Sequence, residues 1–222
     1  VGIWRNYELM DRLGLPGSVT LNAEVCLHEP AVVEEMVKRN WCILGHGMTN
    51  SQLLATLPEA EERQVINDTL SIIQRATGKR PIGWLGPGLA ESFSTPELLV
   101  EAGVKYVCDW VCDDQPFLLK VKKGRLMSVP YSTHINDIPL ILDQKLSDEA
   151  FCQAICDQFD VLYADGATIP RTMGIALHPF LVGVPHRFKH LERALAYVAG
   201  HKDVWFCTGD DIANWYEAEY CR

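Results

Sequence analysis

Apolar residues follow two spacings along this chain, and the two spacings predict different elements. Alternation of apolar and polar residues, or a short apolar run bounded by glycine or proline, predicts a strand, whereas apolar residues recurring every three or four positions predict a helix. The predicted strands cover residues 18–21, 42–45, 82–84, 105–109, 172–177 and 204–207. The predicted helices cover residues 3–13, 30–39, 57–77, 147–164, 187–199 and 210–220, and one more begins at Ser94.

Helices and strands alternate along the chain, apart from a hairpin expected over residues 118–130 with its turn at Lys123-Gly124. Such alternation predicts a parallel sheet, open or closed into a barrel. No low-complexity linker interrupts the sequence. We therefore expect a single α/β domain over residues 1–222.

Local signals mark several element boundaries. The first helix is expected to stop at Gly14, and the long helix that opens at Pro58 to stop at Gly78, because glycine favours the left-handed conformation after a helix. Ser147 predicts an N-cap. Ser94-Thr95-Pro96-Glu97 carries a second N-terminal signature.

Four strand-like runs end in residues with polar or aromatic chemistry. Residues 175–180 read as a buried strand that ends at His178, where Pro179 forbids continuing the ladder. The other three runs end at His46, Trp84 and Asp109. In parallel α/β folds the rim formed by strand ends is where chemistry occurs. The alternative is that each polar end is only a hydrogen-bonded strand cap.

Composition limits the classes of function. With 48% hydrophobic residues among 222, the chain can bury a sizeable core. No apolar run reaches the ~18 residues of a membrane helix, and no signal peptide is visible. The formal charge of −9 and the lack of a basic patch argue against nucleic acid as a partner. A small neutral or polar substrate and a cytoplasmic location are expected.

The eight cysteines form no CxxC pair, and most lie in apolar surroundings. This usage is typical of free thiols in a reducing compartment, so a zinc knuckle is not expected. Cys152 and Cys156 share one helix face, which favours core packing.

The chain begins directly in helical periodicity, with neither an initiator methionine nor a capping residue. We therefore expect that a preceding segment of the fold is missing.

Polar residues with candidate chemistry gather in a few segments. Gly45-His46-Gly47 offers a histidine between flexible residues, and Asn50 stands where a second histidine would complete an HxxxH pair. The acidic run at residues 108–116 either shifts the pKa values of its own carboxylates or is a solvated loop. The polar segment at residues 130–137 is a candidate pocket lining. His186 and His190 have metal-ligand spacing, but a surface helix face is the preferred interpretation.

These residues together resemble one family. Gly45-His46-Gly47, the run from Gly78 to Trp84, Tyr106-Val107-Cys108-Asp109-Trp110 and Leu177-His178-Pro179 occur in the order found in the polysaccharide deacetylase (NodB-homology) family. The chain is similar above all to the branch of metal-independent allantoinases and uncharacterised deacetylase-like hydrolases. The resemblance implies a distorted (β/α) barrel that hydrolyses an amide C–N bond, with a metal held by an Asp and two His.

The chain departs from the family pattern at three points. The acidic pair of the first motif would precede Val1, so the barrel is expected to lack its first strand. Asn50 replaces the second histidine, and Leu85 stands where the family has an arginine. Asp109 with Trp110, and His178, are retained.

Two functions follow from the resemblance and its departures. The first is hydrolysis of a non-peptide C–N bond, such as a cyclic ureide, an imide or an acetamido group of a small molecule or sugar. His178, Asp109 and His46 are then catalytic, with His178 as general acid or base tuned by a neighbouring carboxylate. The expected substrate-binding residues are Trp84, Glu91, Trp110, Asp114, Tyr131 and Asn136. The second function is a catalytically silent binding or assembly module that retains the barrel.

Two further expectations concern metal and assembly. His46 and Asn50 are too few and too weak as ligands for a tight transition-metal site, so no bound metal is expected there. The alternative is zinc or another divalent metal, with Asp109 or Asp113 as the anionic ligand. A missing strand would leave unpaired edges at residues 18–21 and 204–207, which predicts a homo-oligomer.

Overall fold

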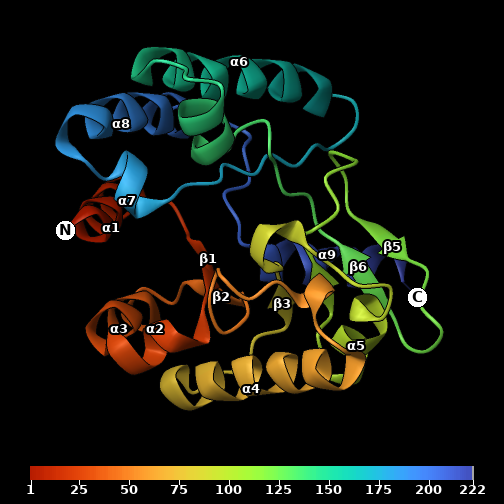
Figure 1. Ribbon diagram of the computed structural model, residues 1–222. Coiled ribbons are helices and arrows are strands. Elements are labelled where there is room, and N and C mark those ends of the chain that lie inside the picture. Colours follow the sequence, from red (N-terminus) through yellow and green to blue (C-terminus); the bar gives the residue numbers. More distant parts are fainter. Residues whose placement is uncertain (222) are drawn as a thin grey trace. The chain divides into compact units, whose positions relative to one another are not determined.

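The computed structural model describes residues 1–221, and its backbone contacts divide them into two compact units. Unit 1 comprises residues 1–16, 111–115 and 130–206, and unit 2 comprises residues 17–110, 116–129 and 207–221. The chain therefore enters each unit three times (Figure 1). The expectation of one domain over residues 1–222 stays a prediction.

Unit 2 is built on a six-stranded sheet in the order β1-β2-β3-β4-β6-β5. Its strands are β1 (Ser18–Leu21), β2 (Cys42–Gly45), β3 (Gly83–Trp84), β4 (Tyr106–Val107), β5 (Phe117–Leu119) and β6 (Leu126–Ser128). All neighbours pair in parallel except β5 and β6, which form an antiparallel hairpin. The predicted parallel sheet and hairpin are both confirmed, with Gly124 at φ 74° in the turn.

Helices cover this sheet and bury its apolar side chains. They are α2 (Ala23–His28), α3 (Pro30–Lys38), η1 (Leu54–Thr56), α4 (Glu59–Thr77), η2 (Pro87–Leu89), α5 (Thr95–Glu101) and α9 (Gly209–Tyr220). Figure 1 shows α4 running beneath the strands. Ile66 and Leu70 of α4 pack with Trp84 of β3 in one buried cluster. Gly78 ends α4 with φ 77°, as predicted.

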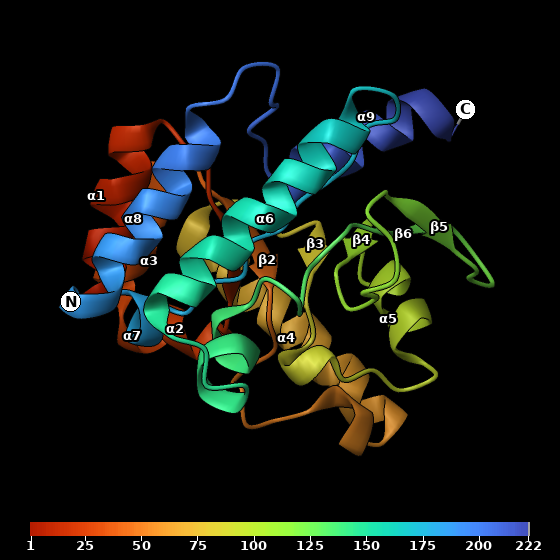
Figure 2. The same ribbon diagram turned by 90° about the horizontal axis from the view of Figure 1, so that it is seen from above.

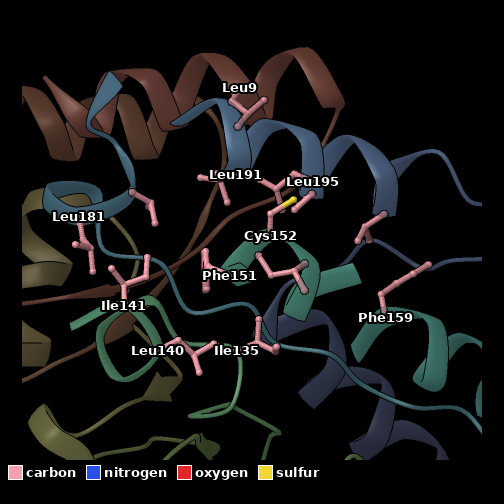
Figure 3. Packing of buried hydrophobic residues seen from close by; sticks show 14 residues of the cluster. Leu9, Ile135, Leu140, Ile141, Phe151, Cys152, Phe159, Leu181, Leu191 and Leu195 are labelled. Atoms are coloured by element: carbon pink, nitrogen blue, oxygen red, sulfur yellow. The ribbon is translucent and has the colours of Figure 1, made fainter. Parts of the chain in front are cut away.

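Unit 1 is a group of packed helices. They are α1 (Gly2–Leu13), η3 (Ile138–Asp143, a π-helix), α6 (Asp148–Gly166), α7 (Pro179–Val182) and α8 (Pro185–Ala199). α6 and α8 lie side by side, and α1 packs on α7 and α8 (Figure 2). Figure 3 shows the buried cluster between them, with Leu9 of α1, Cys152 of α6 and Leu191 of α8. Ser147 caps α6 as predicted, because its hydroxyl accepts the Ala150 N–H at 3.1 Å.

Two of the predicted strands, at residues 172–177 and 204–207, are wrong. Within residues 172–177 only Ala176 pairs, in an isolated parallel bridge with Asn136, and residues 204–207 form no strand. Val204 and Phe206 still pack on the core of unit 1, whereas Trp205 is 59% exposed. Alternation therefore predicted which side chains are buried, but it carries no information on whether a neighbouring strand is present to accept hydrogen bonds.

Two local details also differ from the sequence predictions. The six-residue helix α2 was not predicted, because so short a segment has little periodicity. Ser94 stands at the N-cap position of α5, where the N-terminal signature predicted the helix to begin. Its side chain makes no capping bond, and its hydroxyl donates to Glu59 Oε2 at 2.8 Å.

The cysteines and the helices can be compared with what the composition predicted. All eight cysteines, which lie within the described residues, are free thiols. Burial raises the pKa of the Cys42 thiol to about 11, so this thiol is unreactive at neutral pH. Among residues 1–221, no helix combines the length and the apolar character needed to cross a membrane.

Candidate active site

Three neighbouring parallel strands of unit 2 bring polar groups to one edge of the sheet. His46 follows β2, Leu85-Gly86 follows β3, and Asp109 follows β4 by one residue. The His46 ring Nδ1 lies 2.5 Å from the Leu85 carbonyl oxygen, and the Gly86 N–H donates to Asp109 Oδ1 at 2.7 Å. Hydrogen bonds thus connect the three strand ends in series.

The contact of His46 fixes which ring nitrogen carries a proton. A carbonyl oxygen only accepts hydrogen bonds, so Nδ1 must be the donor to Leu85. Neutral His46 then has its lone pair on Nε2, on the other side of the ring. The backbone is held as well, because the Asn22 amide donates to the His46 carbonyl oxygen at 2.5 Å. Gly47 follows with φ 66°, a conformation that favours glycine.

Asp109 is the most unusual group at this edge. Its Oδ2 is buried and receives no hydrogen bond from the described protein groups, and the same holds for Oε1 of Glu91. Burial and the neighbouring Glu91 raise the pKa of Asp109 well above its ordinary value. Burial also raises the pKa of Glu91, although the neighbouring Asp109 and Trp110 side chains act in the opposite direction.

The two tryptophans predicted to contact substrate differ in exposure. Trp110 is 45% exposed beside Asp109, whereas Trp84 has no exposed surface and packs within the core of unit 2. A Cβ on Gly45 would lie 2.6 Å from Cε3 of Trp84, so glycine is required where the indole lies on β2. The substrate-binding role of both tryptophans stays a prediction.

In unit 1, His178 is held by a buried carboxylate. Its Nδ1 lies 2.6 Å from Asp137 Oδ1, and its backbone N–H donates to Asp137 Oδ2 at 2.7 Å. The Asp137 side chain has no exposed surface, whereas that of His178 is 33% exposed. Asp137 therefore holds the Nδ1–H tautomer and leaves Nε2 as the nitrogen that can exchange protons with a ligand.

The backbone around Asp137 explains why the two residues meet. The bridge between Asn136 and Ala176 aligns the two segments, and the Asp137 N–H donates to the Ala176 carbonyl oxygen at 3.2 Å. His178 lies two residues beyond Ala176, on the same side of the extended segment, and Pro179 then begins α7. The carboxylate that contacts His178 is thus Asp137, and its catalytic role stays a prediction.

The remaining predicted residues of unit 1 fall into two groups. Asn136 is buried, and its amide donates to the Tyr131 hydroxyl at 3.1 Å. Asp114 is exposed, and its backbone oxygen accepts the Thr172 N–H at 2.8 Å. Asn136 and Tyr131 therefore lie together beside Asp137, whereas the Asp114 side chain faces solvent. Their contact with substrate stays a prediction.

Comparisons with known proteins place the chain in a family. A sequence profile described as "Polysaccharide deacetylase" matches residues 3–107. The structure of a probable polysaccharide deacetylase from Pseudomonas aeruginosa PAO1 is 32% identical with a TM-score of 0.92, over 99% of this chain and 73% of that one. This chain belongs to the polysaccharide deacetylase family, whose members include hydrolases of C–N bonds. The predicted fold class, that of the deacetylase (β/α) barrel, is confirmed.

Two other relatives show the breadth of this similarity. The structure of Puue Allantoinase is 30% identical with a TM-score of 0.93, over 100% of this chain and 74% of that one. A Schizosaccharomyces pombe protein, named as a polysaccharide deacetylase, is 27% identical over 239 residues, which cover 99% of this chain and 73% of the relative. The predicted likeness to both deacetylases and allantoinases is confirmed.

Family membership makes a divalent metal plausible, but the donor groups in this chain fit one poorly. Asn50, at the position of the second histidine, is exposed in a turn. Among residues 1–221 there is no group of three or more His, Cys, Asp or Glu residues arranged to hold a metal ion. A catalytic zinc normally takes three protein ligands, so the described residues do not build such a centre.

Proposed function

We propose that this chain hydrolyses a non-peptide C–N bond in an acetamido, ureide or imide group of a small molecule or sugar, with His178 as the proton-transfer residue. The observation that carries the proposal is the His178–Asp137 pair, at 2.6 Å between Nδ1 and Oδ1. General acid–base catalysis needs an imidazole that is oriented and accessible. Membership of the deacetylase family supports the same reaction class.

His178 has one task in this reaction. Water adds to the carbonyl carbon, the C–N bond breaks, and the nitrogen leaves with a proton. Nε2 accepts a proton from the attacking water and returns it to the leaving nitrogen. Asp137 keeps Nδ1 protonated throughout and stabilises the imidazolium that forms between the two transfers. The π-helix η3 begins directly after Asp137, which fixes the backbone of this carboxylate.

The hydrogen bond of His46 to Leu85 limits what its ring can bind. Because Nδ1 donates to Leu85, the neutral ring offers only an acceptor at Nε2. In this form it binds a substrate N–H, a water or a cation, and only the imidazolium polarises a carbonyl.

The proposal is tested by turnover of allantoin, a cyclic imide and an N-acetyl sugar, each with and without zinc. For any compound that is turned over, His178→Gln should lower kcat by about 10²–10⁴-fold, the usual contribution of a general acid–base residue. His186→Gln is the matched control, because His186 is a 68% exposed histidine of the same unit. Equal activity of His178→Gln and His186→Gln contradicts the assignment.

A second candidate is a catalytically silent binding module. It is favoured by one observation, namely that the described residues lack a three-ligand metal group. The same compounds decide between the two. Saturable binding of a compound without its hydrolysis, under every metal condition, supports the silent module.

For metal, we infer no tightly bound transition metal at His46. Metal analysis of protein purified without chelator should find far less than one zinc per chain. Near-stoichiometric zinc that is lost in His46→Ala contradicts this inference.

Assembly and location complete the proposal. β1 is an edge strand of the sheet of unit 2, and an unpaired edge favours pairing with another chain. We therefore propose a homo-oligomer, tested by light scattering after size exclusion; a monodisperse monomer contradicts it. Eight free thiols favour a reducing compartment such as the cytoplasm.

A further inference from the structure

Phe180 of unit 1 is a large apolar residue that the fold leaves in solvent beside His178. It is 67% exposed, although it stands in α7 next to buried residues. Its ring centroid lies 5.9 Å from that of the His178 imidazole, and the two ring planes meet at 62°. Aromatic rings prefer such an edge-to-face arrangement. An apolar ring therefore adjoins the partly exposed imidazole of the proposed proton-transfer residue.

The backbone that carries Phe180 is held on both sides. Before it, the His178 N–H donates to Asp137 Oδ2 at 2.7 Å. After it, Leu181 and Val182 are buried, and Figure 3 shows Leu181 within the hydrophobic cluster of unit 1. The N–H groups of Leu181 and Val182 donate to the His178 carbonyl oxygen, at 2.8 and 3.1 Å. Phe180 thus projects from a turn whose two following side chains are fixed in the core.

Close packing of α1 fixes the same turn. A Cβ on Gly2 or on Gly183 would collide with the Pro179 carbonyl oxygen, so the backbones of α1 and α7 meet there directly. The Arg5 guanidinium also donates to the Gly183 carbonyl oxygen at 2.7 Å. The turn therefore has little freedom to rotate Phe180 into the core.

A second exposed ring of unit 1 shows why exposure alone is not the argument, since single apolar residues at a surface are common. Tyr163 also meets a histidine edge to face, with 5.3 Å between the ring centroids of Tyr163 and His201. The Tyr163 ring stacks on Phe159 as well, and its hydroxyl donates to the Lys202 carbonyl oxygen at 3.1 Å. Packing between α6 and the end of α8 therefore accounts for Tyr163. Phe180 differs because the ring that it meets belongs to the proposed base.

We propose that Phe180 is a substrate-contact residue, whose exposed ring packs against an apolar or planar face of the substrate next to the C–N bond that is broken. This statement rests on the proposed function, because it places the substrate at His178. Ligand sites combine apolar and aromatic walls with a few placed polar groups, and Phe180 with His178 supplies one of each. The pair selects compounds in which a polar C–N group adjoins an apolar face.

The test uses two cyclic imides, succinimide and phthalimide, which share the C–N group and differ by a fused apolar ring. Calorimetry on the full chain measures the dissociation constants, and KM is measured where turnover occurs. Wild type should bind phthalimide about 10-fold more tightly, the discrimination that an added apolar group gives. Phe180→Ala should bring the two constants within about 2-fold of each other, whereas Phe180→Tyr keeps the ring and should keep the preference.

Tyr163→Ala is the matched control, because it removes the other partly exposed ring that meets a histidine edge to face, and it should keep the preference for phthalimide. If Phe180→Ala does not fold, Phe180→Gln, which also lacks the ring, gives the same readout.

Three outcomes overturn the role of Phe180. They are an unchanged preference in Phe180→Ala, a wild type that binds neither imide, and a fall in kcat with unchanged binding, because the ring would then act on His178 and not on the substrate. Binding with the expected preference but without hydrolysis supports the contact at Phe180 and counts against the proposed function alone.

Discussion

Asp137 in unit 1 and Asp109 in unit 2 are two aspartates at the ends of extended segments, and their partners differ in kind. Both oxygens of Asp137 accept N–H donors, one from the His178 ring and one from its backbone. Asp109 has a donor for one oxygen only, and its other neighbour is the carboxyl group of Glu91. In the second arrangement, burial and the neighbouring Glu91 raise the pKa of Asp109 well above its ordinary value. The same residue type thus meets N–H donors at both oxygens in one unit and at only one oxygen in the other.

The largest effect is expected for Asp137→Asn. In Asp137→Asn an amide N–H2 would face one of the two N–H donors, so the ring loses its orientation. We expect kcat to fall by about 10²–10⁴-fold. Asp68→Asn, at an exposed aspartate outside the candidate site, is the control and should retain its kcat. Equal steady-state kcat values for Asp137→Asn and Asp68→Asn would contradict the role of Asp137.

Glu62 extends the comparison to a third buried acid, which has two hydroxyl donors. Glu62→Ala leaves the Ser92 and Thr95 hydroxyls without their acceptor and creates a cavity. The free energy of unfolding should therefore fall by about 2–4 kcal/mol. Glu59→Ala is the control, since the Glu59 side chain is 59% exposed and also accepts a serine hydroxyl. Its cost should be clearly smaller than that of Glu62→Ala, because solvent screens an exposed contact. Urea unfolding measures both, and similar losses would show that the buried contacts are not the stronger ones.

The dependence of stability on pH separates the Asp109–Glu91 pair from ordinary carboxylates. Burial raises both pKa values in the folded state above those of the unfolded chain. The pair's contribution to stability is therefore fully present below the unfolded pKa of about 4 and is lost as pH rises through the folded values. Asp109→Asn should remove most of this loss in urea unfolding between acidic and alkaline pH. A slope identical to that of wild type contradicts the raised pKa of Asp109.

The smallest expected effects on stability are those of alanine substitutions at Gly86 and Gly166. Gly86→Ala places a Cβ 3.0 Å from Asp109 Oδ2 and 3.3 Å from the Ala90 carbonyl oxygen, so it should destabilise by about 1–2 kcal/mol. Gly166→Ala, at the end of α6, meets no atom within 4 Å and should stabilise by up to about 1 kcal/mol. Thermal unfolding of both variants checks the signs. Two changes of the same sign would show that the space around Gly86 is not limiting.

Sequence patterns predicted the elements that depend on local chemistry. β1 and β2 have the predicted bounds, and Gly14 and Gly78 end their helices in the left-handed conformation. The pattern failed at residues 204–207, where alternating burial exists without a hydrogen-bonding neighbour. Burial depends on the side chains of one segment, whereas a strand requires a second segment whose position the local pattern does not contain.

The same distinction applies to the candidate site. His46, Asp109 and His178 could be named from motifs, but Asp137 was not identified as the partner of His178, 41 residues away. A signal was present, since Asp137 ends the polar segment at residues 130–137 that was predicted to line a pocket. The pairing of Glu91 with Asp109 could not be read at all, because it depends on how the glycine-containing loop after β3 returns toward β4.

The contact between Gly45 and the Trp84 indole has a consequence for optical measurements. Trp84 has no exposed surface, and its Nε1 makes no hydrogen bond to the described residues. An indole in such an apolar, rigid environment emits at short wavelength and is shielded from aqueous quenchers. Trp205, at 59% exposure, is open to them. The emission lost in Trp84→Phe and protected from iodide therefore reports the β2–β3 contact, and it needs no added dye.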